Sequence, residues 1–449
     1  MRTLSSTLTT AQQEGGNVLF KAVFTKAGQS TRTYGVDTDN VIIRLSHTES
    51  EWSQKADVIV ENGDGTLTAL DLTGYTATIS FGYITTAGDE YSAVAPLECI
   101  SQQGTTQFLG GNFFITFTCA GIFDMMGEDE ASDEYSVDDT NTDTVKTILT
   151  AIANATMSVY SHCKNYTITF DKEDSLIDTF IPKDYFKVSF KESRLSAFKK
   201  VLKWTKCKAR IEANGAIHVF NPTISGSTYD YEYNDAVSNH NFFEKSVRNR
   251  LVIPNKVVVS SSPDHENQYT GNDTDATSYA ALGRYINQYH WIRLASNAQA
   301  TAIATAILQG YQVGQENGHG SAPLNCGQEV MDYVKITDSA AGDTRTGNIG
   351  YIRRICEQGK FDMEFRFGAL DIGGISALVA PIPSIIAETT LSLSERYSYL
   401  AGAYETLADM MDRVISNQQI IVDNIVDVWG RDTVPKWHVV EQLIIPVVS

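Results

Sequence analysis

The feature that most constrains this chain is a regular spacing of apolar residues near its C-terminus. After Pro381-Ile382-Pro383, eleven positions alternate steps of four and three residues, and ten of them are apolar. Such a repeat of 3.5 residues, kept over five heptads, predicts a coiled-coil helix over residues 387–430. The core positions are Leu393, Tyr397, Leu400, Tyr404, Leu407, Met411, Val414, Gln418, Ile421, Ile425 and Val428.

The residues beside this apolar stripe indicate how many helices assemble. Charged pairs at the flanking positions normally select a two-stranded partner, but here those positions are largely apolar. They include Ala401, Ala403, Ala408, Met410, Ile415 and Val422. The widened stripe favours three or more strands and a trimer, with Gln418 as a buried polar layer that sets the register. The alternative is a long helix that packs on the rest of its own chain.

Two stretches before the coiled coil have the composition of β-strands. In residues 1–122, short runs rich in Val, Ile, Phe, Tyr and Thr end at Gly, Asp or Asn, at 18–24, 41–45, 56–60, 75–81 and 113–119. In residues 241–372, strands are expected at 256–260, 330–337, 349–356 and 361–367, with an Ala-rich helix near 297–309. A linker at 373–386 follows, and residues 431–449 read as a β-rich tip.

The two β regions share an order of turns. Thr86-Ala87-Gly88-Asp89 and Ala340-Ala341-Gly342-Asp343 each stand before a strand, a short Gly turn and another strand. We interpret this echo as two similar β-barrels, and common hairpin sequences are the alternative. The expected fold is therefore mainly β, with two tube-like β-barrels split by an inserted α+β domain and followed by the C-terminal coiled-coil helix.

The insertion, residues 123–240, contains both helix and strand signals. Thr142 is expected to cap a helix over 143–160, and Ser193 a helix over 194–206. Asn214-Gly215 lies between strands at 207–212 and 216–220 and predicts a tight hairpin, because these residues adopt the positive φ that such a turn requires.

Opposite charges gather in two parts of the insertion. Residues 123–143 contain nine acids and no base, whereas residues 181–210 contain ten bases and two acids. We expect the basic helix face, Lys199, Lys200, Lys203 and Lys206, to dock the acidic segment of a neighbouring subunit or another anionic partner. The alternatives are an ordinary solvated surface and, since Trp204 is adjacent, nucleic-acid stacking.

The composition argues against several other functions. The formal net charge of −19 disfavours a surface that grips nucleic acid or anionic lipid throughout. No apolar run is long enough to span a membrane, and the first residues lack the apolar core of a signal peptide, so no stable membrane anchoring is expected. The six cysteines form no C-x-x-C pair and are expected to be reduced.

No catalytic or metal-binding motif stands out. The eight histidines have no metal-ligand spacing, and the nucleophile-elbow, P-loop and dinucleotide-binding patterns are absent from the sequence. Cys163 follows His162, but adjacent residues on a strand point to opposite sides, so we do not expect them to form a catalytic pair. We therefore expect no enzymatic activity, no catalytic residue, no metal and no cofactor.

Four segments together resemble the tail hub proteins of tailed bacteriophages, also called baseplate hub or tail-tip proteins. The resemblance covers about residues 17–370 and lies in the order of the elements. The segments are ADVIVENGDGTLTALDLTGYTATISFGYI, SRLSAFKKVLKWTKCKARIEANGAIHVFNP, NRLVIPNKVVVSS and VMDYVKITDSAAGDTRTGNIGYIRRICEQGKFDMEFRFG.

This resemblance implies a homotrimeric ring that closes the distal end of the tail tube, with two barrels per chain matching hexameric tube rings. It implies contacts with the tail tube, distal tail protein rings and receptor-binding or tail fibre proteins, and transient DNA passage through the lumen. The expected location is the virion tail tip, after assembly in the host cytoplasm. The alternatives are a carbohydrate-binding or cell-wall-acting tail protein and a secretion-system spike hub.

Overall fold

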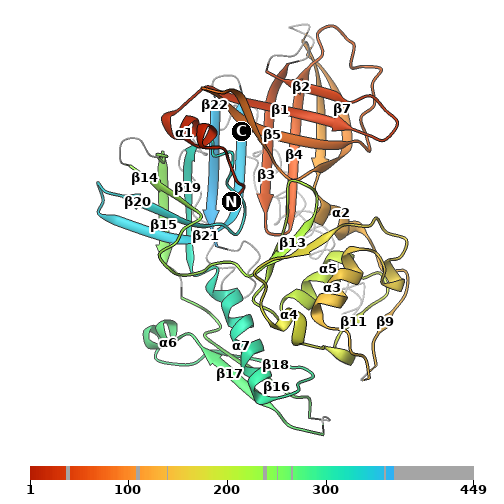
Figure 1. The fold of residues 1–449 in the computed structure, drawn as a ribbon, viewed down its shortest axis with the longest axis vertical. Coiled ribbons are helices and arrows are strands. Elements are labelled where there is room, and N and C mark those ends of the chain that lie inside the picture. Colours follow the sequence, from red (N-terminus) through yellow and green to blue (C-terminus); the bar gives the residue numbers. More distant parts are fainter. Residues whose placement is uncertain are drawn as a thin grey trace, which may run out of the picture. The chain divides into compact units, whose positions relative to one another are not determined.

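The computed structural model describes residues 1–36, 41–107, 112–138, 140–235, 240–249, 251–263, 266–357 and 360–368 (Figure 1). The predicted coiled coil, the linker before it and the C-terminal tip lie outside these residues. Within them, no helix is both long and apolar enough to cross a membrane.

A mostly antiparallel sheet of fourteen strands dominates the fold, as the mainly β prediction requires. Its main path runs β15-β19-β22-β21-β3-β4-β8-β7-β5-β1-β2, with β6 beside β5 and with β20 joining β14 to β21. The strands are β1 (Val18–Thr25), β2 (Arg32–Gly35), β3 (Ile42–Ser50), β4 (Ser53–Glu61), β5 (Thr76–Thr85), β6 (Gly88–Ala93), β7 (Leu97–Gln107), β8 (Asn112–Ala120), β14 (Tyr231–Asn234), β15 (Glu244–Asn249), β19 (Glu316–Pro323), β20 (Tyr333–Asp338), β21 (Asp343–Glu357) and β22 (Lys360–Phe367).

The described strands do not close into two barrels, which corrects that part of the expected fold. The hydrogen-bonded path is open, and β3 of the first β region pairs with β21 of the second, from Tyr351 beside Ser50 to Glu357 beside Arg44. The backbone groups at the edge of β3 therefore form hydrogen bonds with β21 of the other region, so neither region closes on itself.

One hydrophobic core serves both β regions. The buried rings of Phe24 and Phe117 pack 5.0 Å apart in the first region. Tyr233 of β14, which belongs to the large sheet and not to the insertion as predicted, stacks on Phe365 of the second region at 5.1 Å. The N-terminal helix α1 (Ser6–Glu14) joins them, because Gln12 donates to the Tyr231 hydroxyl at 3.0 Å. The two regions thus form one packed body.

The echo seen in the sequence corresponds to the same order of hairpins. β5 and β6 meet at a turn where Gly88 has φ +107°, and β20 and β21 meet at Gly342 with φ +61°. Each turn leads to a further hairpin, β7–β8 or β21–β22. The two copies differ in one respect. The single long strand β21 takes the place of two strands, β6 and β7, and its pairing with β22 shifts register between Ile349 and Tyr351.

The insertion is an α+β unit whose core is continuous with that of the elements described next. Thr144, not Thr142, caps the first long helix, which ends at Ala153 because Asn154 and then Ala155, with φ +53°, leave the helical conformation. Ser193 caps the second helix as predicted, and Gly215, with φ +82°, forms the predicted hairpin turn. The elements are α2 (Ile122–Glu128), β9 (Tyr135–Ser136), α3 (Val145–Ala153), η1 (Ser158–Tyr160), β10 (Ile168–Phe170), α4 (Leu176–Thr179), η2 (Lys183–Tyr185), β11 (Lys187–Val188), α5 (Arg194–Leu202), β12 (Lys208–Ile211) and β13 (Ile217–Phe220).

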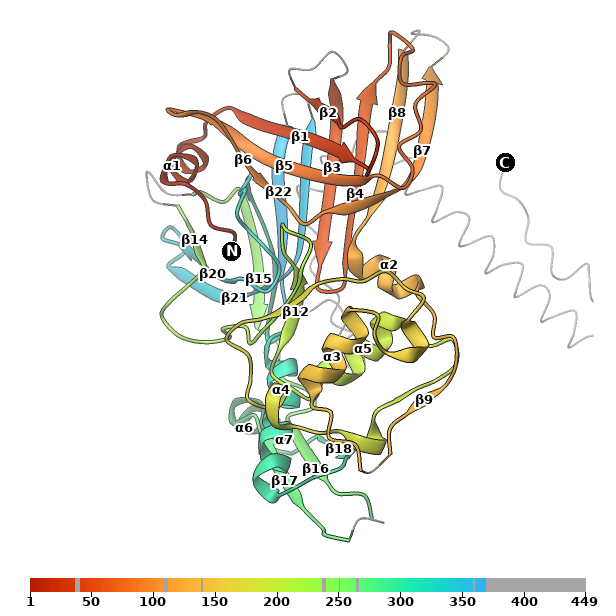
Figure 2. The same ribbon diagram turned by 45° about the vertical axis from the view of Figure 1, so that its right-hand side comes forward.

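A third group of elements leaves the large sheet. β16 (Lys256–Ser260), which we expected to resume the second barrel, pairs instead with β17 (Thr270–Thr274) and β18 (Asn287–Trp291). The group also contains α6 (Ala276–Leu282) and the Ala-rich helix α7 (Asn297–Gln312), which runs along this small sheet (Figure 2). Buried residues of α7 and β16 belong to the same hydrophobic core as those of α3 and α5. This packing forms a cavity lined by residues of α5, α7 and β18.

Candidate docking cleft

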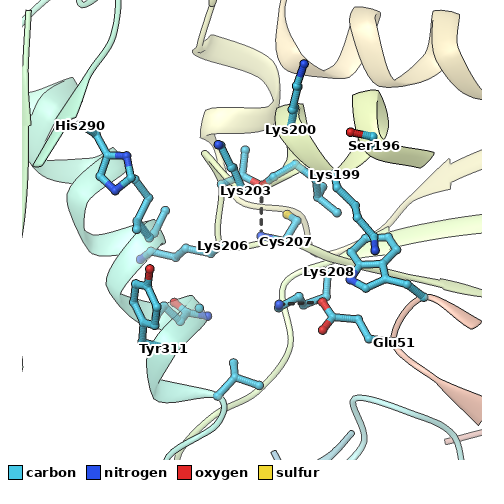
Figure 3. Close-up of a pocket in the computed structure, with 18 of the residues that line it drawn as sticks. Glu51, Ser196, Lys199, Lys200, Lys203, Lys206, Cys207, Lys208, His290 and Tyr311 are labelled. Atoms are coloured by element: carbon cyan, nitrogen blue, oxygen red, sulfur yellow. Dashed lines mark hydrogen bonds and ion pairs between the residues drawn. The ribbon is translucent and has the colours of Figure 1, made fainter. Parts of the chain in front are cut away.

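The four predicted lysines line a cleft of about 710 Å³, which we call the lysine cleft (Figure 3). Lys199 and Lys200 lie in α5, but the helix ends at Leu202 and not at residue 206 as predicted, so Lys203 is its C-cap and Lys206 lies beyond it. The Ser193 side chain accepts from the Ser196 backbone N–H and begins the helix. Leu195, Phe198, Val201 and Leu202 are buried, so the lysines of the helix lie on its other side. Lys199, Lys200, Lys203 and Lys206 all line the lysine cleft, together with Lys208 at the start of β12.

Distant segments supply the remaining walls. Glu51 and Trp52 come from the turn between β3 and β4, His290 from β18, and Tyr311 from α7. The Tyr311 hydroxyl donates to Gln288 Oε1 at 2.7 Å, which ties α7 to β18. No local pattern in the sequence pointed to these residues, since each reaches the lysine cleft only through the packing of three separate elements.

Three of the five lysines have partners within the chain. Lys208 Nζ lies 2.7 Å from Glu51 Oε1, and Lys200 Nζ lies 2.5 Å from Glu192 Oε2. Lys199 Nζ lies 4.9 Å from the centre of the Trp52 ring, within the range of a cation–π contact. These contacts hold the lysines in place and neutralise part of their charge.

Within the part of the chain that the structure describes, the other two lysines and the nearby His290 have no acidic partner. Among the described residues, neither Lys203 nor Lys206 forms an ion pair, and the buried Nε2 of His290 has no hydrogen-bond partner. Partial burial, and then repulsion from Lys200, lower the pKa of Lys203. Burial, and then Lys203, lower the pKa of His290. The lysine cleft is thus a site where an anion would relieve an electrostatic cost.

The cysteines in this part of the chain lack the environment of a nucleophile. Burial raises the pKa of the Cys207 thiol, in the wall of the lysine cleft, to about 11. Cys163 and His162 do meet, with Sγ 3.5 Å from Nε2, because they lie in a turn and not on a strand as our argument assumed. Burial and the nearby Asp129 nonetheless raise the pKa of Cys163, so its thiol stays protonated near neutral pH.

The acidic residues of the insertion divide into two groups. Asp124 accepts from the Ser53 hydroxyl at 2.6 Å and from the Gln54 backbone N–H at 2.8 Å, and Asp129 lies 3.0 Å from the buried Arg194. In contrast, five acids of residues 128–138 are exposed and form no ion pair in the described structure, namely Glu128, Glu130, Asp133, Glu134 and Asp138. We call residues 128–138 the acidic segment.

The predicted trimerisation residues lie outside the described part of the chain, so the coiled coil stays a prediction. They are Leu393, Tyr397, Leu400, Tyr404, Leu407, Met411, Val414, Gln418, Ile421, Ile425 and Val428. Within the described residues, no three His, Cys, Asp or Glu side chains gather in a way that could hold a metal ion.

Comparison with known proteins identifies the fold. No protein-family model matches the sequence, and no curated protein matches it. The tail protein from Neisseria meningitidis MC58 is 10% identical, with a TM-score of 0.54 over 79% of this chain and 98% of that chain. The 43 kDa tail protein of prophage MuSo2 from Shewanella oneidensis is 11% identical, with a TM-score of 0.48 over 78% and 97%. The prophage tail protein gp18 from Listeria monocytogenes EGD-e is 12% identical, with a TM-score of 0.47 over 80% and 96%.

The likeness to the Neisseria meningitidis protein extends over nearly all of that protein and most of this chain. This chain therefore has the fold of a phage tail protein, and the resemblance inferred from the sequence is confirmed at the level of the fold.

Proposed function

We propose that this chain, which has a tail-protein fold, is a non-enzymatic structural protein of a phage tail, assembled as a trimeric hub at the distal end of the tail tube. The fold shared with 98% of the Neisseria meningitidis tail protein is the observation that supports this function most directly. In this role the hub joins the tube and distal tail rings to receptor-binding or fibre proteins. It opens for DNA passage, and it reaches the virion tail tip after assembly in the host cytoplasm.

Two features of the chain support a trimer. The large sheet contains two related sets of hairpins, so three chains would present six similar units to a hexameric tube ring. The heptads at 387–430 would bring three helices together on the axis. The protonated thiols of Cys163 and Cys207 are consistent with a role that needs no nucleophile.

The mass of the protein in solution tests the trimer. Light scattering should give three times the chain mass of 49.4 kDa. Replacing Leu400 and Leu407 together by Asp places charges at two core positions and should yield monomers. Ser398→Asp with Thr406→Asp adds the same charges outside the core and should leave the trimer intact. A wild-type monomer at every concentration, or a trimer that survives the leucine replacements, would contradict the proposed assembly.

Immunogold electron microscopy tests the location. Antibodies raised against this chain should label the distal end of the tail in tailed particles that contain it. Label on the capsid, or its absence from intact particles, would rule out a tail hub.

A further inference from the structure

The lysine cleft has a positive charge that its own chain leaves unbalanced. Glu192 and Glu51 neutralise Lys200 and Lys208, but in the described residues no carboxylate pairs with Lys203 or Lys206. Lys203 is exposed to solvent, and the buried His290 Nε2 lacks a hydrogen-bond partner. Acidic groups from another molecule can therefore enter and pair with donors that are already in place.

The acidic segment has negative charges that complement the lysine cleft, and hydrogen bonds hold its backbone in place. The Ala131 N–H donates to the Glu192 carbonyl at 3.0 Å, and the Ala131 carbonyl accepts from the Lys191 N–H at 3.1 Å. The Ser132 N–H donates to the Val159 carbonyl at 3.0 Å. These bonds fix the segment, so its exposed acids would lose little conformational freedom on binding.

The chain's own acidic segment does not fill its own lysine cleft. None of the exposed acids pairs with a lysine of the lysine cleft within the described structure. The acidic segment borders the lysine cleft at one end, where the Glu130 backbone bridges that of Ser193, but its later part, with β9, lies on the other side of α3 and α5 from α7 in both ribbon views (Figures 1 and 2). The complementary surfaces of one copy are thus free to face different neighbours.

We propose that the lysine cleft of one copy binds the acidic segment of a second copy. Lys203 and Lys206 pair with carboxylates of Glu130 and Glu134. The contact joins two different surfaces, and such a head-to-tail contact closes into a ring when repeated around an axis. This inference rests on the proposed assembly from several copies and identifies the contact that would join neighbours in the ring.

A polypeptide suits the lysine cleft better than a nucleic acid does. Two of its lysines are already neutralised by Glu51 and Glu192, and the formal net charge of the chain is −19. A phosphate backbone would meet these acids as repulsive neighbours. A second copy instead brings only a few carboxylates, and the assembly holds them close to the lysine cleft.

Zero-length cross-linking of the full chain tests this contact directly. Carbodiimide joins a lysine to a carboxylate only when the two are in contact, so we expect bonds between the acidic segment and Lys203 or Lys206. A mixture of unlabelled and nitrogen-15-labelled chains shows which of these bonds join two copies. Mass spectrometry should find mixed-isotope pairs, and their yield should fall when salt is raised to about 0.5 M.

Charge reversal supplies the matched variants. Lys203→Glu with Lys206→Glu should remove the mixed-isotope pairs and weaken self-association roughly tenfold or more. Adding Glu130→Lys and Glu134→Lys to the same chain reverses both surfaces and should restore association. Lys55→Glu, which reverses an exposed lysine on β4, should change neither measurement.

The outcomes separate this inference from the proposed function. Trimers that form no cross-link between copies at Lys203 or Lys206, or that the reversal leaves as tight as before, would refute the contact and leave the hub intact. Binding of inorganic polyphosphate or DNA to the lysine cleft without any cross-link between copies would refute it as well. A wild-type chain that stays monomeric would instead refute the proposed assembly.

Discussion

At the scale of single residues, buried ionic contacts join the insertion to the large sheet. Arg210 of β12 lies 3.2 Å from Glu329 Oε2 and 3.1 Å from Asp332 Oδ1, in the loop before β20. The same guanidinium lies 3.0 Å from Glu212 Oε1, which is also 2.8 Å from His218 Nδ1. Burial opposes ionisation of Glu212, but the His218 contact and the charge of Arg210 prevail and lower its pKa to about 2.

Glu212→Gln tests this network through its pH dependence. The folded-state pKa of Glu212 is below its ordinary value of 4.5, so its charge stabilises the fold above about pH 4.5. At pH 7 the substitution should lower the free energy of unfolding by about 1 kcal/mol. This difference from wild type should shrink as the pH falls from about 4.5 towards 2. Urea unfolding at several pH values measures it, with the exposed Glu14→Gln as control. A loss independent of pH would contradict the assigned charge contact.

At the scale of elements, the lysine cleft depends on how closely α7 packs on the small sheet. A Cβ added at Gly271 of β17 would lie 2.3 Å from the Thr301 backbone nitrogen of α7 and 2.6 Å from the Ala300 carbonyl carbon. The helix backbone therefore approaches the strand at a distance that only glycine permits. Val257 and Val259 of β16 are buried beneath the same helix.

Gly271→Ala tests this close approach. The new methyl group must push α7 away, so the substitution should lower the free energy of unfolding by about 1–3 kcal/mol. Gly310→Ala is the matched control within α7, because a Cβ there would meet no atom within 4 Å. It should instead stabilise the helix by up to about 1 kcal/mol. Thermal unfolding of both variants measures the effects, and equal stability of the two would show that α7 does not press on β17.

At the scale of the whole molecule, the two β regions depend on each other. β3 pairs along its length with β21, and the buried His47 of β3 lies 3.2 Å from the buried Arg354 of β21. Removing either region would expose a strand edge and part of the shared core. Although the sequence resembles two similar barrels, the described structure makes them one body.

A fragment of residues 1–122 tests this dependence. Expressed alone, it should bind a hydrophobic dye and unfold without a cooperative transition, because its partner strand and the part of the shared core that comes from the second β region are missing. Calorimetry and dye fluorescence, compared with the full chain, measure this. A sharp transition for the fragment would mean that the first β region folds as an independent domain.

Local signals in the sequence determined a large part of this protein. The Ser193 cap, the Asn214-Gly215 hairpin and the Ala-rich helix all follow from interactions within a few residues, whereas the helix predicted to present four lysines ends at Leu202, before Lys203 and Lys206. Such interactions act in the same way whatever the rest of the chain does. The tail-protein fold was also evident from the order of these elements.

Only the tertiary structure decided which surfaces meet. The pairing of β3 with β21, the departure of β16 from the large sheet, and the placement of His290 and Tyr311 opposite α5 join segments far apart in the chain. Any strand edge can form hydrogen bonds with many other strands. The pairing that forms is the one that buries the most apolar surface in the whole fold. Neighbouring residues do not contain that information, so the lysines were predicted while the lysine cleft around them was not.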